Sequence, residues 1–261
     1  MLKLGVVPYL NALPLYKTLE ARDDIGITAA VPSQLSRVLD EGEVDVALLP
    51  VVEHFRGVGE SFISSSCIAC TREVRSVLLF SRVPFESIQS VALDMSSRTS
   101  VALTKVILAD SFGLSPSFHD APPDLENMLR ECESALLIGD PALIAVQNLS
   151  RDANHQLRVL DLGEAWFQLT QLPFVFAAWV SRRNLQNADE IARLLDNTRE
   201  DGMSQIAQLA RDAAQTSELS QGLIESYYRN AIEYSMTAAH RQGLEEFRRR
   251  CAIHNLLDST L

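Results

Sequence analysis

Residues 3–15 read KLGVVPYLNALPL. The apolar run before Pro8 has the composition of a β-strand, and Pro8 interrupts it because proline supplies no amide hydrogen to a sheet. Pro14 then opens a helix-like segment through about residue 19. Asn11 therefore falls where a strand becomes a helix, and this junction is where α/β proteins hold small ligands.

Further apolar runs along the chain have the same strand-like character. They cover residues 44–50, 76–81, 90–93, 134–138 and 174–180, with helix-like stretches at 34–42 and 99–112 between them. This alternation predicts an α/β fold with a mostly parallel sheet and helices on both faces. After residue 183 the pattern is almost entirely helical, at 188–214, 219–238 and 243–256, and predicts a helical C-terminal tail that packs on the body.

Two of these runs, 77–80 and 174–180, are apolar throughout, and each is followed by a Ser-Arg pair. We interpret them as two matched strands that cross between two lobes. This interpretation places the first part of one lobe at 1–82, a second lobe at 83–172, and a second crossing strand with a helical return to the first lobe at 173–261. A chain of 261 residues has room for two lobes of roughly 100 to 150 residues each.

The charge balance limits the partners that the chain can bind. With 34 acidic against 23 basic side chains, the net charge of −11 disfavours nucleic acid and anionic membrane surfaces. An anionic ligand would need local donors, such as a helix N-terminus or one well-placed arginine. No run approaches the roughly 20 apolar residues of a membrane span, and the start lacks the pattern of a signal peptide, so we expect a cytoplasmic protein.

Cys67 and Cys70 form a C-x-x-C within the chain's four cysteines. Such a pair serves as a redox couple or as half of a zinc site in some proteins. The run 63–71 has the pattern of a strand or its flank, no second C-x-x-C or H-x-x-x-H follows, and the five histidines are scattered. We therefore expect four free thiols and no metal site.

A cluster of hydroxyl side chains follows the strand at 90–93. Ser97, Arg98, Thr99 and Ser100 stand where that strand gives way to a helix. Free backbone N–H groups at a helix start, together with hydroxyl donors, suit a carboxylate ligand. The same residues are also common helix caps, and both interpretations remain open.

Other strand ends supply three further candidates. The strand at 134–138 leads into Gly-Asp-Pro, so the carboxylate of Asp140 could orient a hydroxyl, act as a general base or cap the helix that follows. Pro50 and Val51 end a strand at a possible pocket edge. Trp166 and Thr170 precede the run at 174–180, and Trp166 lines a cleft or belongs to the core.

Several ordered phrases resemble the menaquinone-biosynthetic chorismate dehydratases of the futalosine pathway. They are VPYLNALPL, PSQL, GEVDVALLPVVE, RSVLLFS, VALDMSSRTS, LLIGD, DLGEAW and TQLPFVFAAW, and they span about residues 2–182. Members of that family resemble type II periplasmic binding proteins, with two α/β lobes and two crossing hinge strands, and work in the cytoplasm. The chain departs from the family at Gln171, where a TGLPF phrase has glycine, and in the cysteine-containing segment 66–72.

The resemblance implies that chorismate loses water to give 3-[(1-carboxyvinyl)oxy]benzoate, without a cofactor. It implies catalytic roles for Asn11 and Asp140, although we favour the substrate's own enolpyruvyl carboxylate as the base, because a buried aspartate repels a dianion unless it is protonated. It also implies a substrate pocket, to which we assign Asn11, Pro50, Val51, Ser66, Ser97, Arg98, Thr99, Ser100 and Thr170. The substrate is then a small molecule, and the pocket needs no metal.

Three alternatives share this fold. A sister enzyme acts on cyclic dehypoxanthine futalosine, and assays with both substrates would separate the two activities. A small-anion solute-binding protein should carry an export signal, which we do not find. The effector-binding half of a transcription regulator should follow a DNA-binding helix pair, whereas this sequence begins in a strand.

Overall fold

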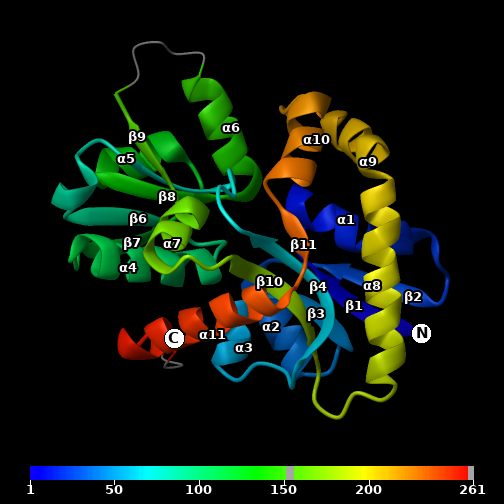
Figure 1. The fold of residues 1–261 in the computed structure, drawn as a ribbon. Coiled ribbons are helices and arrows are strands. Elements are labelled where there is room, and N and C mark those ends of the chain that lie inside the picture. Colours follow the sequence, from blue (N-terminus) through cyan, green and yellow to red (C-terminus); the bar gives the residue numbers. More distant parts are fainter. Residues whose placement is uncertain (151–155, 258–261) are drawn as a thin grey trace.

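The computed structural model describes residues 1–150 and 156–257, which form two β-sheets flanked by helices (Figure 1). The first sheet has the strand order β11-β4-β10-β3-β1-β2 and the second has the order β7-β6-β8-β5-β9. The strands of the first sheet are β1 (Leu2–Val6), β2 (Ile25–Ala29), β3 (Val46–Pro50), β4 (Phe62–Cys70), β10 (Phe174–Ser181) and β11 (Glu233–Ser235). Those of the second are β5 (Val77–Ser81), β6 (Ser90–Asp94), β7 (Ser117–Ala121), β8 (Ser134–Ile138) and β9 (Arg158–Asp161).

Each sheet has a parallel half and an antiparallel half. Strand β1 runs parallel to β2 and β3, whereas β10 runs antiparallel to β3 and β4. Likewise β6 is parallel to β7 and β8, whereas β5 is antiparallel to β8 and β9. The α/β class is confirmed, but the prediction of mostly parallel pairing is wrong, because β5 and β10 enter their sheets in the opposite direction.

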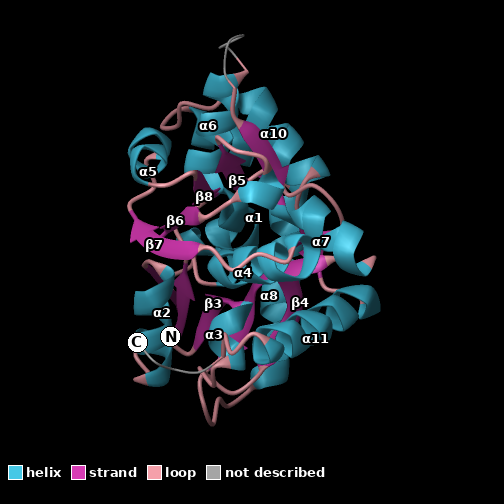
Figure 2. Ribbon diagram, turned by 90° about the vertical axis from the view of Figure 1, so that its left-hand side faces the viewer, coloured by secondary structure: helices cyan, strands magenta, loops and turns pink. Residues whose placement is uncertain are grey.

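The helices divide between the two sheets, and two of them reach both. The first group is α1 (Leu13–Tyr16), α2 (Pro32–Asp40), α3 (Val51–Phe55), α8 (Ala188–Ser204), α9 (Ile206–Ala214), α10 (Gln221–Asn230) and α11 (Ala238–Ile253). The second is α4 (Thr99–Phe112), α5 (Leu125–Glu131), α6 (Gly139–Leu149) and α7 (Leu162–Thr170). Figure 2 shows α4 and α7 between the sheets, and both contact β10 of the first sheet as well as strands of the second.

Two connections join the sheets, but they are not the strands that we predicted. Strand β5 lies wholly within the second sheet, so the chain crosses first at residues 71–76 and returns at 171–173. The runs at 77–80 and 174–180 are apolar throughout because β5 and β10 are each buried inside a different sheet. Strand β4, rather than β5, is the partner of β10, with Cys70 opposite Phe174.

The C-terminal tail completes the first sheet. The helix predicted at 219–238 ends at Asn230, and β11 then pairs with β4 before α11 begins at Ala238. The predicted helix at 188–214 divides into α8 and α9 near Gln205. The tail is therefore part of the first sheet as well as a cover for it.

One carboxylate ties the first connection to helix α7. Asp161 accepts hydrogen bonds from Val74 N at 3.1 Å and Arg75 N at 2.7 Å, and it also caps α7 through Gly163 N at 2.9 Å and Glu164 N at 3.2 Å. A Cβ on Gly163 would lie 2.4 Å from the Arg72 carbonyl oxygen. Asp161 and Gly163 of the DLGEAW phrase thus fit the close approach of α7 to this connection.

The second connection rests on an aromatic core. Trp166 is fully buried, and its Nε1 donates to the Pro173 carbonyl at 3.3 Å. Its ring meets Phe174 and Phe247 edge to face. Of the two interpretations of Trp166, the structure supports the core.

Candidate active site

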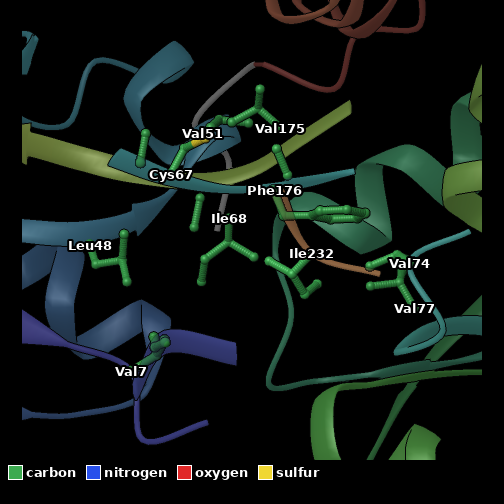
Figure 3. Close-up of a cluster of buried hydrophobic side chains, with 14 of the residues drawn as sticks. Val7, Leu48, Val51, Cys67, Ile68, Val74, Val77, Val175, Phe176 and Ile232 are labelled. Carbon is green, nitrogen blue, oxygen red and sulfur yellow. The ribbon is translucent and has the colours of Figure 1, made fainter. Parts of the chain in front are cut away.

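A cavity of about 560 Å³, including its open mouth, lies between the two sheets. Six apolar residues form much of its wall, Val7, Leu48, Ile68, Val74, Val77 and Phe176 (Figure 3). Polar side chains from both sides complete it: Tyr9, Asn11, Ser76, Ser96, Ser97, Arg98, Thr99 and Ser100.

The structure brings most of the predicted pocket residues to this one cavity. Asn11 follows β1 and Pro50 ends β3, so both come from the first sheet. The segment 97–100 stands between β6 and α4, on the side of the second sheet. Residues 11 and 99, far apart in the sequence, thus line the same space.

Three predicted pocket residues do not line the cavity, and we remove them from the candidate site. The hydroxyl of Ser66 donates to Asp196 Oδ1 at 2.7 Å, because its side chain is directed toward α8. The hydroxyl of Thr170 donates to the Trp166 carbonyl at 2.8 Å within α7. Val51 is fully buried at the start of α3.

The hydroxyl cluster both caps helix α4 and joins the two halves of the cavity. Ser97 Oγ accepts from Ser100 N at 3.2 Å, which is the role of a capping residue. Thr99 Oγ1 accepts from Val52 N of α3 at 3.4 Å, so this bond links the start of α4 to the side of the first sheet. Since this bond uses only a lone pair of Thr99, the hydroxyl hydrogen remains available to a ligand.

Arg98 is the only charged residue that lines the cavity in the part of the chain that the structure describes. Among those residues, it has no carboxylate partner and no hydrogen bond from its guanidinium. It stands at the N-terminus of α4, where the helix dipole also favours negative charge. An unpaired cation in a largely apolar cavity favours an anionic ligand.

Asp140 lies beside the cavity rather than in its wall. Its Oδ1 accepts from Leu10 N at 3.3 Å. This bond links helix α6, beside the second sheet, to the segment that follows β1 of the first sheet. Burial raises the pKa of Asp140 to about 6. It does not cap α6, because the capping position is Ile138 and no side chain bonds there.

Sequence reasoning missed three polar residues of the cavity. Tyr9 stands in the same quoted phrase as the predicted Asn11, and Ser96 directly precedes the predicted residues 97–100. Both therefore lay next to residues that we had already assigned to the site. Ser76 stands in the quoted phrase RSVLLFS, but we considered that phrase only as a strand and not as part of a site. Ser96 Oγ donates to the fully buried Asp94 at 2.5 Å, which fixes the loop before α4.

The cysteines lie away from reactive surroundings. All four are free and buried, and burial raises the pKa of Cys67 to about 12. In Figure 3, Cys67 lies on the opposite side of β4 from Ile68, which lines the cavity. Within residues 1–150 and 156–257, no group of three or more His, Cys, Asp or Glu side chains is arranged to hold a metal ion. In the same residues, no helix has both the length and the apolar character to cross a membrane.

Two sheets joined by two connections over a shared cavity define a protein with the fold of periplasmic binding proteins. A protein from Archaeoglobus fulgidus has this fold with a TM-score of 0.79 and 14% identity, covering 97% of each chain. The periplasmic aliphatic sulphonate binding protein of Escherichia coli gives a TM-score of 0.69 at 16% identity, over 98% of this chain and 87% of its own.

Sequence comparison assigns the chain to a smaller group of proteins than the fold does. The chain belongs to the menaquinone biosynthesis family, whose model matches residues 2–253. A chorismate dehydratase of Thermus thermophilus is 30% identical over 257 residues, which are 94% of this chain and 93% of that protein. The match extends beyond residue 182, so it includes the helical tail.

Proposed function

We propose that this chain is a chorismate dehydratase that forms 3-[(1-carboxyvinyl)oxy]benzoate in the futalosine route to menaquinone. The observation that carries the proposal is the unpaired Arg98 in a cavity shared by both sheets. The family membership and the relationship to a chorismate dehydratase support the same substrate. The enzyme would then be a carbon-oxygen lyase.

The cavity has complementary groups for a ring that carries two carboxylates. One carboxylate would lie at the start of α4, where Arg98 and the Thr99 hydroxyl donate to it. The ring would lie against apolar side chains such as Ile68 and Phe176. Asn11 would contact the ring hydroxyl, since its Oδ1 is buried and has no hydrogen-bond partner among the described residues.

The reaction removes the ring hydroxyl and the hydrogen on the adjacent carbon that bears the ether. We infer that the enolpyruvyl carboxylate of the substrate takes this proton, because the described wall of the cavity contains no carboxylate or imidazole. The electron pair of the broken C–H bond then forms the ring double bond as hydroxide leaves, and the proton joins the hydroxide as water. Aromatisation drives the step, and the protein's contribution is placement and desolvation.

Assays with two substrates distinguish chorismate dehydration from the activity of the sister enzyme. Purified protein is incubated with chorismate alone or with cyclic dehypoxanthine futalosine alone, and the products are identified by mass spectrometry. We expect an 18 Da loss from chorismate, with an aromatic product, and no change in the second substrate. Conversion of cyclic dehypoxanthine futalosine alone would overturn the proposal. Binding of chorismate without conversion would indicate a solute-binding protein.

We also expect the enzyme in the cytoplasm. Four buried free cysteines are compatible with a reducing compartment. Cell fractionation with an antibody against the native chain tests this, and recovery in a periplasmic extract would contradict it.

A further inference from the structure

Asp94, the last residue of β6, is a fully buried carboxylate directly behind the cavity wall. It does not line the cavity itself. Its Oδ1 accepts from Ser96 N at 2.9 Å and from Ser96 Oγ at 2.5 Å, and its Oδ2 accepts from Ile138 N at 3.2 Å. Ser96 and Ile138 both line the cavity, so this one carboxylate holds two separate segments of the wall.

The first of these segments is the turn that carries Arg98. Asp94 holds this turn through its side chain, which bonds to Ser96, and through its main chain, because its carbonyl oxygen accepts from Ser97 N at 3.1 Å. Arg98 follows directly and precedes the first residue of α4. The conformation of the turn therefore decides where the Arg98 side chain begins in the cavity wall.

The second segment is the end of strand β8. The backbone register of β6 and β8 ends at Leu93, which lies opposite Leu136. Two residues further along β8, Ile138 N donates to the side chain of Asp94, so this side chain continues the hydrogen bonding where the backbone pairing stops. Gly139 follows at once and also lines the cavity. Asp94 therefore fixes the turn and the end of β8 relative to each other.

Asp94 is also the acidic residue nearest to Arg98 in the sequence, yet the two do not form an ion pair. Both of its oxygens already accept from Ser96 and Ile138. A carboxylate that was free to turn toward Arg98 would compete with the substrate for the guanidinium. The three bonds thus hold Asp94 in place and leave Arg98 available to an anion.

We propose that Asp94 is a positioning residue for the anion site, because its carboxylate holds the turn 95–98 against the end of β8 and so directs Arg98 to a carboxylate of the substrate. This inference rests on the proposed function for the identity of the substrate. Asp94 itself makes no contact with the substrate in this account.

The variant Asp94→Asn keeps the size of the side chain and replaces one oxygen by an NH₂ group, which can only donate. Since all three groups around Asp94 also donate, at least one bond is lost and two donors face each other. We expect KM for chorismate to rise about tenfold. The value of kcat should stay within about threefold of wild type, because Arg98 holds an unreactive part of the substrate.

Asp196 of α8 supplies a matched control. Its Oδ1 accepts from the hydroxyls of three consecutive residues of β4, at distances of 2.7 to 2.9 Å, and none of these four residues lines the cavity. We expect both Asp94→Asn and Asp196→Asn to lower the melting temperature, whereas only Asp94→Asn raises KM. An equal rise of KM in both variants would show a general loss of structure and overturn the inference.

A double-mutant cycle tests whether Asp94 acts through Arg98. The chorismate dissociation constant is measured for Asp94→Asn, for Arg98→Gln and for the double variant. If Asp94 positions Arg98, its substitution changes this constant less than about twofold once residue 98 is glutamine. The same tenfold weakening in both backgrounds would overturn the inference. So would a lower KM in Asp94→Asn, which would show that the buried charge only repels the substrate.

Measuring binding as well as turnover separates the two proposals. If the wild type binds chorismate but does not convert it, the proposed function fails, whereas the cycle on dissociation constants still tests the role of Asp94. If the wild type converts chorismate and the cycle shows no coupling, only the inference about Asp94 fails.

Discussion

Arg98 carries the positive charge of the cavity without a carboxylate partner among the described residues. A charge-assisted hydrogen bond contributes about 1.5 to 3 kcal/mol, so Arg98→Gln should raise KM for chorismate by roughly tenfold to a hundredfold. The control is Arg37→Gln, because Arg37 is exposed on α2 in an ion pair with Glu41. Steady-state kinetics of both variants test this, and an unchanged KM in Arg98→Gln would remove the arginine from the site.

Thr99 is expected to donate its hydroxyl hydrogen to the same carboxylate. Thr99→Val keeps the shape of the side chain but removes the acceptor of Val52 N, so it should keep the fold with a lower melting temperature and lower chorismate turnover by at least roughly tenfold. Thr104→Val is a suitable control, since Thr104 is buried on the same helix and its hydroxyl donates to the Ser100 carbonyl. Equal kinetics in wild type and Thr99→Val would leave the hydroxyl cluster as a helix cap only.

Asp140 is not expected to be the base, because it does not line the cavity. Asp140→Asn should therefore retain turnover within about tenfold of wild type, whereas loss of a general base costs roughly a hundredfold or more. A chorismate analogue without the enolpyruvyl carboxylate should bind and not react. A variant that binds chorismate normally but is nearly inactive would contradict substrate assistance.

The same substitution gives a prediction for stability against pH. Burial raises the pKa of Asp140 from 3.8 to about 6, so between these values the native state holds a proton that the unfolded state has lost. Stability therefore falls as pH rises through this window. Asp140→Asn should melt at a higher temperature than wild type at pH 7.5, and the difference should disappear near pH 3.5. A difference that stays constant from pH 3.5 to 7.5 would show that ionisation is not the cause.

The sequence predicted the site residues that belong to recognisable strand ends. Asn11 and the segment 97–100 follow apolar strands, so their place in the fold was readable. Ser66 was assigned through the resemblance, and Thr170 also through its place before the run at 174–180, yet their hydroxyls bond to Asp196 and to the Trp166 carbonyl instead.

At the scale of elements, the strands that the sequence did not predict are the edges of the two sheets. They are β2 and β11 in the first sheet and β7 and β9 in the second. Most residues of β7 and β9 are exposed or half-buried, so they lack the continuous apolar runs that revealed inner strands such as β3 and β5. An edge strand forms because a neighbour offers unpaired backbone groups, and that neighbour is not visible in the local sequence.

The start of helix α7 gives an element-scale prediction. A Cβ at residue 163 would meet the Arg72 carbonyl at 2.4 Å and Cys70 Sγ at 2.6 Å, so Gly163→Ala should destabilise the fold by about 1 to 3 kcal/mol. Gly222→Ala is the control, because Gly222 is exposed on α10 and nothing lies within 4 Å of the place that an added methyl group would take. Alanine there should be neutral or stabilising. Urea unfolding gives the free energy of unfolding of each variant relative to wild type. An equal loss in both variants would contradict the prediction.

At the scale of the whole molecule, contacts across the cavity hold the two sheets together. Leu10 N donates to Asp140, and Val52 N donates to Thr99. On the far side, Asp110 of α4 pairs with Arg250 and His254 at the end of α11. The cavity is thus lined by residues that belong to both sheets, and a ligand inside it would touch residues from widely separated parts of the chain.

The most direct test of this account is a crystal structure of the protein with bound 3-[(1-carboxyvinyl)oxy]benzoate. We predict that the product occupies the cavity between the sheets, with one carboxylate on Arg98 and Thr99 and its ring against Ile68 and Phe176. Product density outside this cavity, or in it with both carboxylates remote from Arg98, would contradict the account.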